Sequence, residues 1–169
     1  MIDIKKKLKK FGPLEFLVLS SLSYVVVMLV WTATTRSEVL QKASDIKSNH
    51  KMVVELINNE VNECSSNIEG KTSWGENCNS SWDSSKIVNY IINNFKLKNP
   101  YNTKKPLIQI SSDPRIQAEG KAGQSTDKGI IFVSSNNFDS EAGSEWLIGT
   151  CIKSPCVAAG NNELVSVYR

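Results

Sequence analysis

The sequence predicts an α+β protein in which a long N-terminal helix, transmembrane and then amphipathic, packs on a small antiparallel β-sheet. Three observations lead to this fold class: an apolar run at residues 14–33, a following stripe of apolar residues at helical spacing, and short extended segments between residues 107 and 168. At 169 residues the chain has room for one compact domain besides a membrane anchor.

The apolar run reads LEFLVLSSLSYVVVMLVWTA, with Glu15 as its only charge. About 20 apolar residues are enough to cross the hydrocarbon core of a bilayer. Five lysines precede the run within the first ten residues, and this arrangement places the N-terminus in the cytoplasm. We therefore expect a basic cytoplasmic leader or tail at 1–12, a transmembrane helix at 13–35, and an extracytoplasmic α+β domain at 36–169 that includes the outer half of the long helix.

The formal net charge of +3 comes from these lysines, and the rest of the chain is close to neutral. The composition therefore predicts a membrane partner and no nucleic-acid partner. The alternative to an anchor is a cleaved secretory signal, but a cut after Ala33 would put Trp31 where a small residue is needed. We expect an uncleaved single-pass protein of an inner membrane, with its outer domain in the periplasm or on a cell-surface filament.

Beyond the membrane run, apolar residues keep a spacing of three or four, which predicts one buried helical face. No proline or glycine interrupts residues 14–64, so the two parts are expected to form one continuous helix. The predicted stripe consists of Val39, Ala43, Ile46, His50, Val53, Ile57, Val61 and Cys64.

A second helix is predicted after the loop at residues 65–85, capped by Asp83 or Ser84 and ended by Asn99 and Pro100. Its apolar face would consist of Ile87, Val88, Ile91, Ile92 and Phe95. Short extended segments then predict an antiparallel meander. These segments are 107–111, 115–118, 129–134, 146–152 and 164–168.

The four cysteines form two local pairs, Cys64 with Cys78 and Cys151 with Cys156, and all lie on the predicted outer side. In an oxidising compartment such pairs are read as disulfides. A zinc site is the alternative, but the first pair lacks the short spacing of a zinc knuckle.

The segment FGPLEF at residues 11–16 resembles the start of mature type IV pilins and pseudopilins, which begin with a pattern like FTLIEL. Phe11 matches the first position of that pattern and Glu15 the fifth. The resemblance implies that Phe11 and Glu15 act in assembly, with Glu15 pairing with the freed amine of an adjacent subunit. The alternative is that Glu15 is an ordinary flanking charge of an anchor helix. The segment Asn99-Pro100-Tyr101 also resembles a turn found in many pseudopilins.

The sequence departs from the family at the processing site, which the resemblance places at Lys10, Phe11 and Gly12. Lys10 occupies the position where pilin leaders have glycine, and the nearest glycine, Gly12, is two residues later.

Searching for chemistry gives no enzyme motif, so we expect no enzymatic activity, no cofactor and no metal site. The single histidine, His50, lies on the apolar stripe and is expected to pack rather than to act as a base. Trp74 and Trp82 are expected to cover the edge of the core, with contact to sugars or a partner as the alternative.

The resemblance therefore implies a structural subunit that associates with itself or with other pilin-like subunits through its N-terminal helix, in a filament or an envelope machine. The alternative is a single-pass membrane protein whose outer domain binds a ligand or serves as an accessory subunit.

Overall fold

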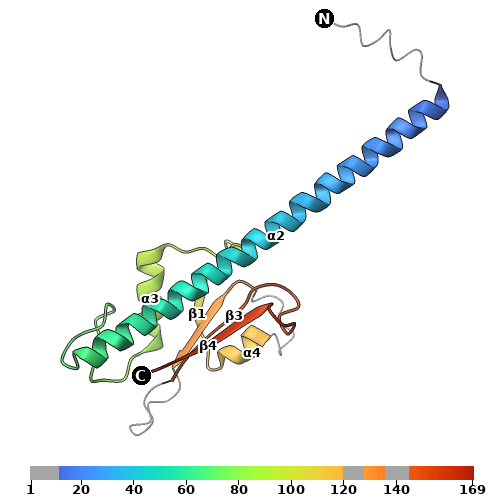
Figure 1. The fold of residues 1–169 in the computed structure, drawn as a ribbon. Coiled ribbons are helices and arrows are strands. Elements are labelled where there is room, and N and C mark those ends of the chain that lie inside the picture. Colours follow the sequence, from blue (N-terminus) through green and yellow to red (C-terminus); the bar gives the residue numbers. More distant parts are fainter. Residues whose placement is uncertain (1–11, 120–127, 136–144) are drawn as a thin grey trace, which may run out of the picture. The chain divides into compact units, whose positions relative to one another are not determined.

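The computed structural model describes residues 12–119, 128–135 and 145–169 (Figure 1). The described residues divide into two compact units, one ending at Gln41 and the other beginning at Lys42. Lys10 and Phe11, which belong to the predicted processing and assembly site, lie outside the described residues.

A single helix, α2 (Pro13–Ser66, 54 residues), begins in the first unit and ends in the second. Its first residue is a proline, which fits the first turn because the missing N–H has no intrahelical partner there. The predicted continuous helix over residues 14–64 is confirmed. Within the first unit, every residue from Leu14 to Gln41 is exposed.

In the second unit, one face of α2 is buried, as the spacing predicted. The buried residues are Ile46, His50, Val53, Ile57, Glu60, Val61 and Cys64. Val39, the first residue of the predicted stripe, is exposed. The buried part of α2 matches the strands of the sheet in length. Residues 46–61 of a helix and a seven-residue strand such as β3 both measure roughly 23 Å.

The second helix, α3 (Ser84–Phe95), is capped by Asp83, one of the two predicted caps. The Asp83 carboxylate accepts the backbone N–H of Ser85 at 2.8 Å and the Ser85 hydroxyl at 2.6 Å, and these bonds lower the pKa of Asp83. Ile87, Val88 and Ile91 are buried, whereas Ile92 and Phe95 at the end of the helix are exposed. The helix ends earlier than predicted, because Lys96 adopts a left-handed conformation with φ of 46°.

The sheet has four strands in the order β1-β2-β3-β4. The strands are β1 (Ile108–Ile110), β2 (Ile131–Ser135), β3 (Glu145–Cys151) and β4 (Asn162–Tyr168). β3 pairs antiparallel with both of its neighbours, but β1 pairs parallel with β2, placing Ile108 opposite Ile131. Four of the five predicted extended segments are strands, and the prediction of an antiparallel meander is wrong for β1, which pairs parallel with β2.

The segment 115–118, predicted as a strand, belongs to a short helix, α4 (Pro114–Glu119). The Asp113 carboxylate accepts the Arg115 N–H at 3.0 Å, so an aspartate cap followed by proline starts this helix. A parallel pair needs a crossover connection, and the segment containing α4 supplies it between β1 and β2.

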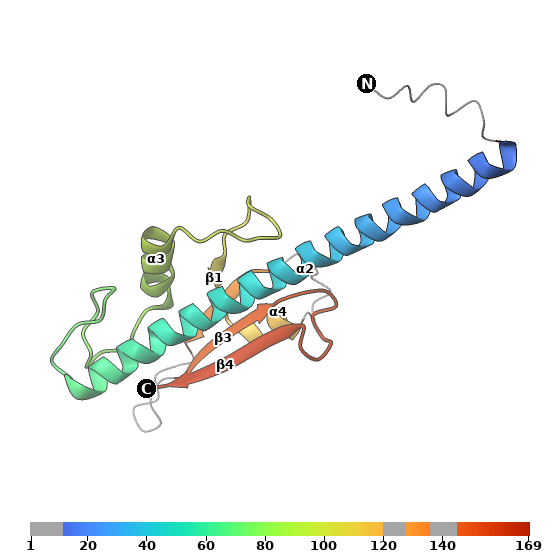
Figure 2. The same ribbon diagram turned by 45° about the horizontal axis from the view of Figure 1, so that its top comes forward.

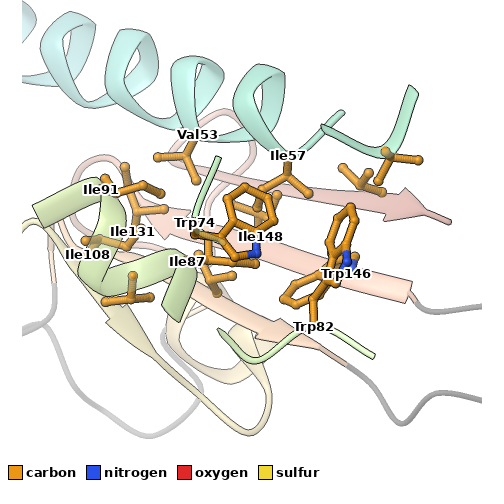
Figure 3. Packing of buried hydrophobic residues seen from close by; sticks show 14 of the residues in the cluster. Val53, Ile57, Trp74, Trp82, Ile87, Ile91, Ile108, Ile131, Trp146 and Ile148 are labelled. Atoms are coloured by element: carbon orange, nitrogen blue, oxygen red, sulfur yellow. The ribbon is translucent and has the colours of Figure 1, made fainter. Parts of the chain in front are cut away.

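Helices contact both faces of the sheet. On one face, Val53 and Ile57 of α2 pack toward Ile148, with Ile87 and Ile91 of α3 beside them (Figure 3). On the opposite face, a Cβ atom on Gly149 would lie 2.8 Å from the Pro114 carbonyl oxygen. Glycine at this position therefore permits the close approach of α4 to β3.

Candidate functional site

The first unit presents an apolar helical surface that no described residue covers. Side chains that are large and hydrophobic occupy this surface, each between 47% and 75% exposed. They are Leu14, Phe16, Leu17, Val18, Leu19, Leu22, Tyr24, Val25, Val26, Val27, Met28, Leu29, Val30, Trp31, Val39 and Leu40. α2 is long and apolar enough to cross a membrane. Exposed apolar surfaces of this extent are typical of segments that contact lipid or other proteins.

Hydroxyl groups within this segment bond back to the helix itself. Ser20 donates to the Leu17 carbonyl at 2.9 Å, and Ser21 donates to the Val18 carbonyl at 2.8 Å. Thr34 donates to the Trp31 carbonyl at 2.9 Å. Since these donors find acceptors within the helix, they place no unsatisfied polar group in an apolar environment.

Glu15 caps the start of the helix. Its carboxylate accepts the backbone N–H of Gly12 at 2.7 Å, three residues earlier. This is the return bond of a capping box, which satisfies an N–H that has no intrahelical partner. The predicted assembly residue therefore has a local partner within the same chain.

His50 is buried beneath the sheet face, as predicted for a packing residue, and both of its ring nitrogens have partners. Nε2 lies 3.1 Å from the carbonyl oxygen of Ile148 in β3, and Nδ1 lies 3.1 Å from the Glu163 carboxylate in β4. Each ring nitrogen therefore lies within hydrogen-bonding distance of an oxygen atom from another element. Lys47 also reaches Glu163, at 3.4 Å. His50 thus ties α2 to two strands and has no nitrogen available for a substrate.

Two buried carboxylates organise the loop after α2. Glu60 accepts the backbone N–H of Ser73 at 3.0 Å and also the Ser73 hydroxyl. Glu76 accepts the Trp74 indole N–H at 3.0 Å and the Asp83 backbone N–H at 2.9 Å. These bonds hold a loop of irregular backbone over the core.

Glu76 also forms an ion pair with Lys86 of α3, with a distance of 3.3 Å between the Lys86 Nζ and the carboxylate. A disulfide between Cys64 and Cys78 ties the same loop to the end of α2, and another joins Cys151 to Cys156. Both predicted cysteine pairs are therefore bonded, and no free cysteine remains.

Trp74 and Trp82 cover the core, as predicted. Their rings meet edge to face with centroids 5.2 Å apart, and Trp82 lies 6.1 Å from Trp146 of β3 (Figure 3). The Arg169 guanidinium stacks over Trp82 at 4.3 Å and donates to the Ser80 carbonyl at 2.7 Å. Burial lowers the pKa of Arg169, and the nearby Glu76 charge acts in the opposite direction.

The turn at Asn99 links α3 to the start of β2. The fully buried Asn99 accepts the Tyr101 backbone N–H at 2.8 Å and donates to the Lys128 carbonyl at 3.2 Å. Gly129 has φ of +80°, and a Cβ atom there would lie 2.7 Å from the Asn99 Oδ1, so the turn needs glycine. Burial raises the pKa of Tyr101, over whose ring the Lys128 ammonium lies at 4.2 Å.

The described residues contain no group of three or more metal-ligating side chains. Comparison of the chain with family models, with curated proteins and with solved structures finds no match.

Sequence reasoning identified the apolar helix, His50 and the cysteines, but it missed Glu60, Glu76 and Glu163. Each of these carboxylates bonds to a group at least seven residues away in the chain. The available signal was that Glu60 lies three residues after Ile57 and four before Cys64, on the helical face predicted to be buried, where a charge needs a partner.

Proposed function

We propose that this chain is a pilin-like or pseudopilin-like structural subunit, which assembles through its N-terminal hydrophobic helix into a filament or an envelope machine. It acts by packing and not by catalysis, and it needs no cofactor. The observation that carries the proposal is the exposed apolar segment of α2, directly preceded by the FGPLEF motif at residues 11–16.

Membrane residence precedes assembly in this proposal. The chain sits in an inner membrane with its basic N-terminus in the cytoplasm, and the disulfide-bonded unit faces the periplasm or the outside of a filament. The two disulfides support this orientation, because such bonds persist in oxidising compartments. In the assembled state, apolar side chains of neighbouring helices replace lipid around residues 14–33.

The test of assembly is the variant Glu15→Gln. A glutamine oxygen still accepts the Gly12 N–H, so the helix cap is kept while the charge available to a neighbouring subunit is lost. We expect co-purification with other pilin-like subunits to fall to background. The matched control is Glu63→Gln, which makes the same chemical change at an exposed position of the same helix.

Mass spectrometry of the mature N-terminus supplies a second readout. A chain that begins at Phe11 in cells containing a prepilin peptidase supports processing in spite of Lys10. A chain that keeps Met1, together with full co-purification of Glu15→Gln, overturns the proposal.

The second candidate is a single-pass protein whose outer unit binds a ligand or serves as an accessory subunit. Two observations favour it, the local bond from Gly12 to Glu15 and the lysine at position 10. In that case Glu15→Gln has no effect on complex formation.

A further inference from the structure

Among the described strands, β4 forms one edge of the sheet and lies at its outer margin in Figure 2. An edge strand offers unpaired backbone N–H and C=O groups, and proteins usually protect such edges with lysine, proline or short length. β4 has seven residues, NELVSVY, with no lysine and no proline. The opposite edge strand, β1, has only three residues.

The hydrogen-bond pattern shows which backbone groups of β4 point outward. Just beyond the paired region, the Ile152 N–H donates to the Asn161 carbonyl at 2.7 Å. Bonded and non-bonded residue pairs alternate in antiparallel strands, so Val165 bonds to β3. Leu164 and Ser166 therefore direct their N–H and C=O groups away from the sheet.

A groove of about 460 Å³ runs between this edge and α2. It is lined by Lys47, Lys51, Ser44 and Ser48 of α2 and by Val165 of β4, among others. An additional strand on β4 would place every second side chain in this groove, because side chains alternate between the two faces of a sheet.

The charge of the groove selects the occupant. The Lys47 and Lys51 side chains are 50% and 75% exposed. Against these two lysines the lining has one carboxylate, Glu163, so the balance of its lysine and carboxylate charges is positive. Lys51 pairs with Glu55 at 3.5 Å, an exposed interaction of the kind that contributes little. The groove therefore complements negative side chains.

On the other face of β4, Leu164 and Tyr168 are 39% and 67% exposed. An added strand would cover them with apolar side chains alternating with its acidic ones. A second copy of β4 fits less well, since its one charged side chain, Glu163, already forms an ion pair with Lys47 of its own chain at 3.4 Å.

We propose that β4 accepts an extended acidic segment of a second protein as a fifth strand, with backbone bonds to Leu164 and Ser166 and acidic side chains beside Lys47 and Lys51. The main-chain bonds supply affinity and the lysines supply selectivity. This interaction does not involve the exposed apolar segment of α2 at residues 14–33.

The decisive variant is Ser166→Pro. Proline removes an outward N–H without removing a bond to β3, so the sheet keeps its pairing while the edge loses a donor. The matched control, Ser166→Ala, removes only the hydroxyl that donates to Glu145 at 2.8 Å. Lys51→Gln tests the charge of the groove, because Lys51 pairs with Glu55 of its own helix and not with a residue of β4.

The experiment uses the full chain in detergent micelles and measures hydrogen exchange of the Leu164 and Ser166 amides. The probe is a capped octapeptide of alternating glutamate and valine. Its controls are the same peptide with lysine in place of glutamate, and the same peptide with alternate backbone nitrogens methylated. We expect the glutamate peptide to slow exchange at both amides about tenfold or more, and Ser166→Pro to weaken its binding about tenfold.

Several outcomes would overturn the proposal. They are unchanged exchange at saturating glutamate peptide, equal protection by the lysine or methylated peptide, and unchanged affinity in Ser166→Pro. Protection that rises with protein concentration without peptide would show pairing between two copies instead. If Ser166→Pro does not fold, the methylated peptide still decides the matter, because it lacks the donors that strand addition requires.

Discussion

The two parts of α2 share one secondary structure but meet different surroundings. In residues 13–41, apolar side chains are exposed around the whole helix, and serine and threonine hydroxyls bond to carbonyls three or four residues back. In residues 42–66, one stripe is buried, and it includes two polar residues, His50 and Glu60, with partners from strands and a loop. The hydroxyls of the first part bond within the helix, whereas His50 and Glu60 of the second part bond to other elements of its unit.

The carboxylates of the helix show the same contrast. Glu15 finds its partner three residues away, at Gly12. Glu60 finds its partner 13 residues away, at Ser73. A helix suited to lipid keeps its polar bonds local, because the bilayer interior offers no others.

The largest expected effect tests the membrane role of the first part. Replacing Val25 and Leu29 by lysine places two charges in the apolar run, each unfavourable by about 3 kcal/mol near the centre of a bilayer. We expect the variant to leave the membrane fraction on cell fractionation. Lysines at the exposed positions Asn58 and Asn62 of the second part are the control and should leave membrane residence unchanged.

The second prediction concerns the buried stripe of the second part of α2, with the first part as the control. Ile57→Ala should lower the free energy of unfolding of the second unit by about 2–5 kcal/mol, because Ile57 is fully buried and its loss leaves a cavity. Denaturant unfolding followed by tryptophan fluorescence in mild detergent measures this. Leu22→Ala, at a position 63% exposed, should leave the transition unmoved. Equal effects of the two variants would contradict the division of α2.

A third prediction concerns the long-range carboxylates. Glu76→Ala leaves the Trp74 indole N–H and the Asp83 backbone N–H without an acceptor, which should destabilise the second unit by about 3 kcal/mol. The same unfolding assay applies. Glu69→Ala, at an exposed residue of the same loop, should stay within about 0.5 kcal/mol of the original chain.

The smallest effect is a local one and depends on pH. Asp83→Ala removes the cap of α3 and should destabilise by about 1 kcal/mol. Because the pKa of Asp83 is lowered from 3.8 in the folded state, its charge contributes stability above about pH 4. That contribution is lost as pH falls through the lowered value. Asp83→Asn keeps a capping oxygen but has no carboxylate, so the unfolding free energy of this variant should vary less between pH 5 and pH 2. A pH profile equal to that of the original chain would contradict the role of the Asp83 charge.

Local sequence signals predicted most of the elements. The uninterrupted spacing from Leu14 to Cys64 predicted α2, the aspartate cap predicted α3, and the cysteine spacing predicted both disulfides. The wrong prediction of a strand at residues 115–118 also concerns a local signal. Asp113 followed by Pro114 is a helix start, but the apolar residues after it were interpreted as part of a strand.

The sequence by itself determined which segments are apolar, where helices begin, and which cysteines are near enough to bond, because each depends on residues a few positions apart. Tertiary structure alone decided the parallel pairing of β1 with β2, the partners of Glu60, Glu76 and Glu163, and the open edge of β4. These depend on groups that are distant in the chain and meet only after the sheet has formed. No local pattern specifies them, because a strand's neighbours are set by packing against the helices and not by its own residues.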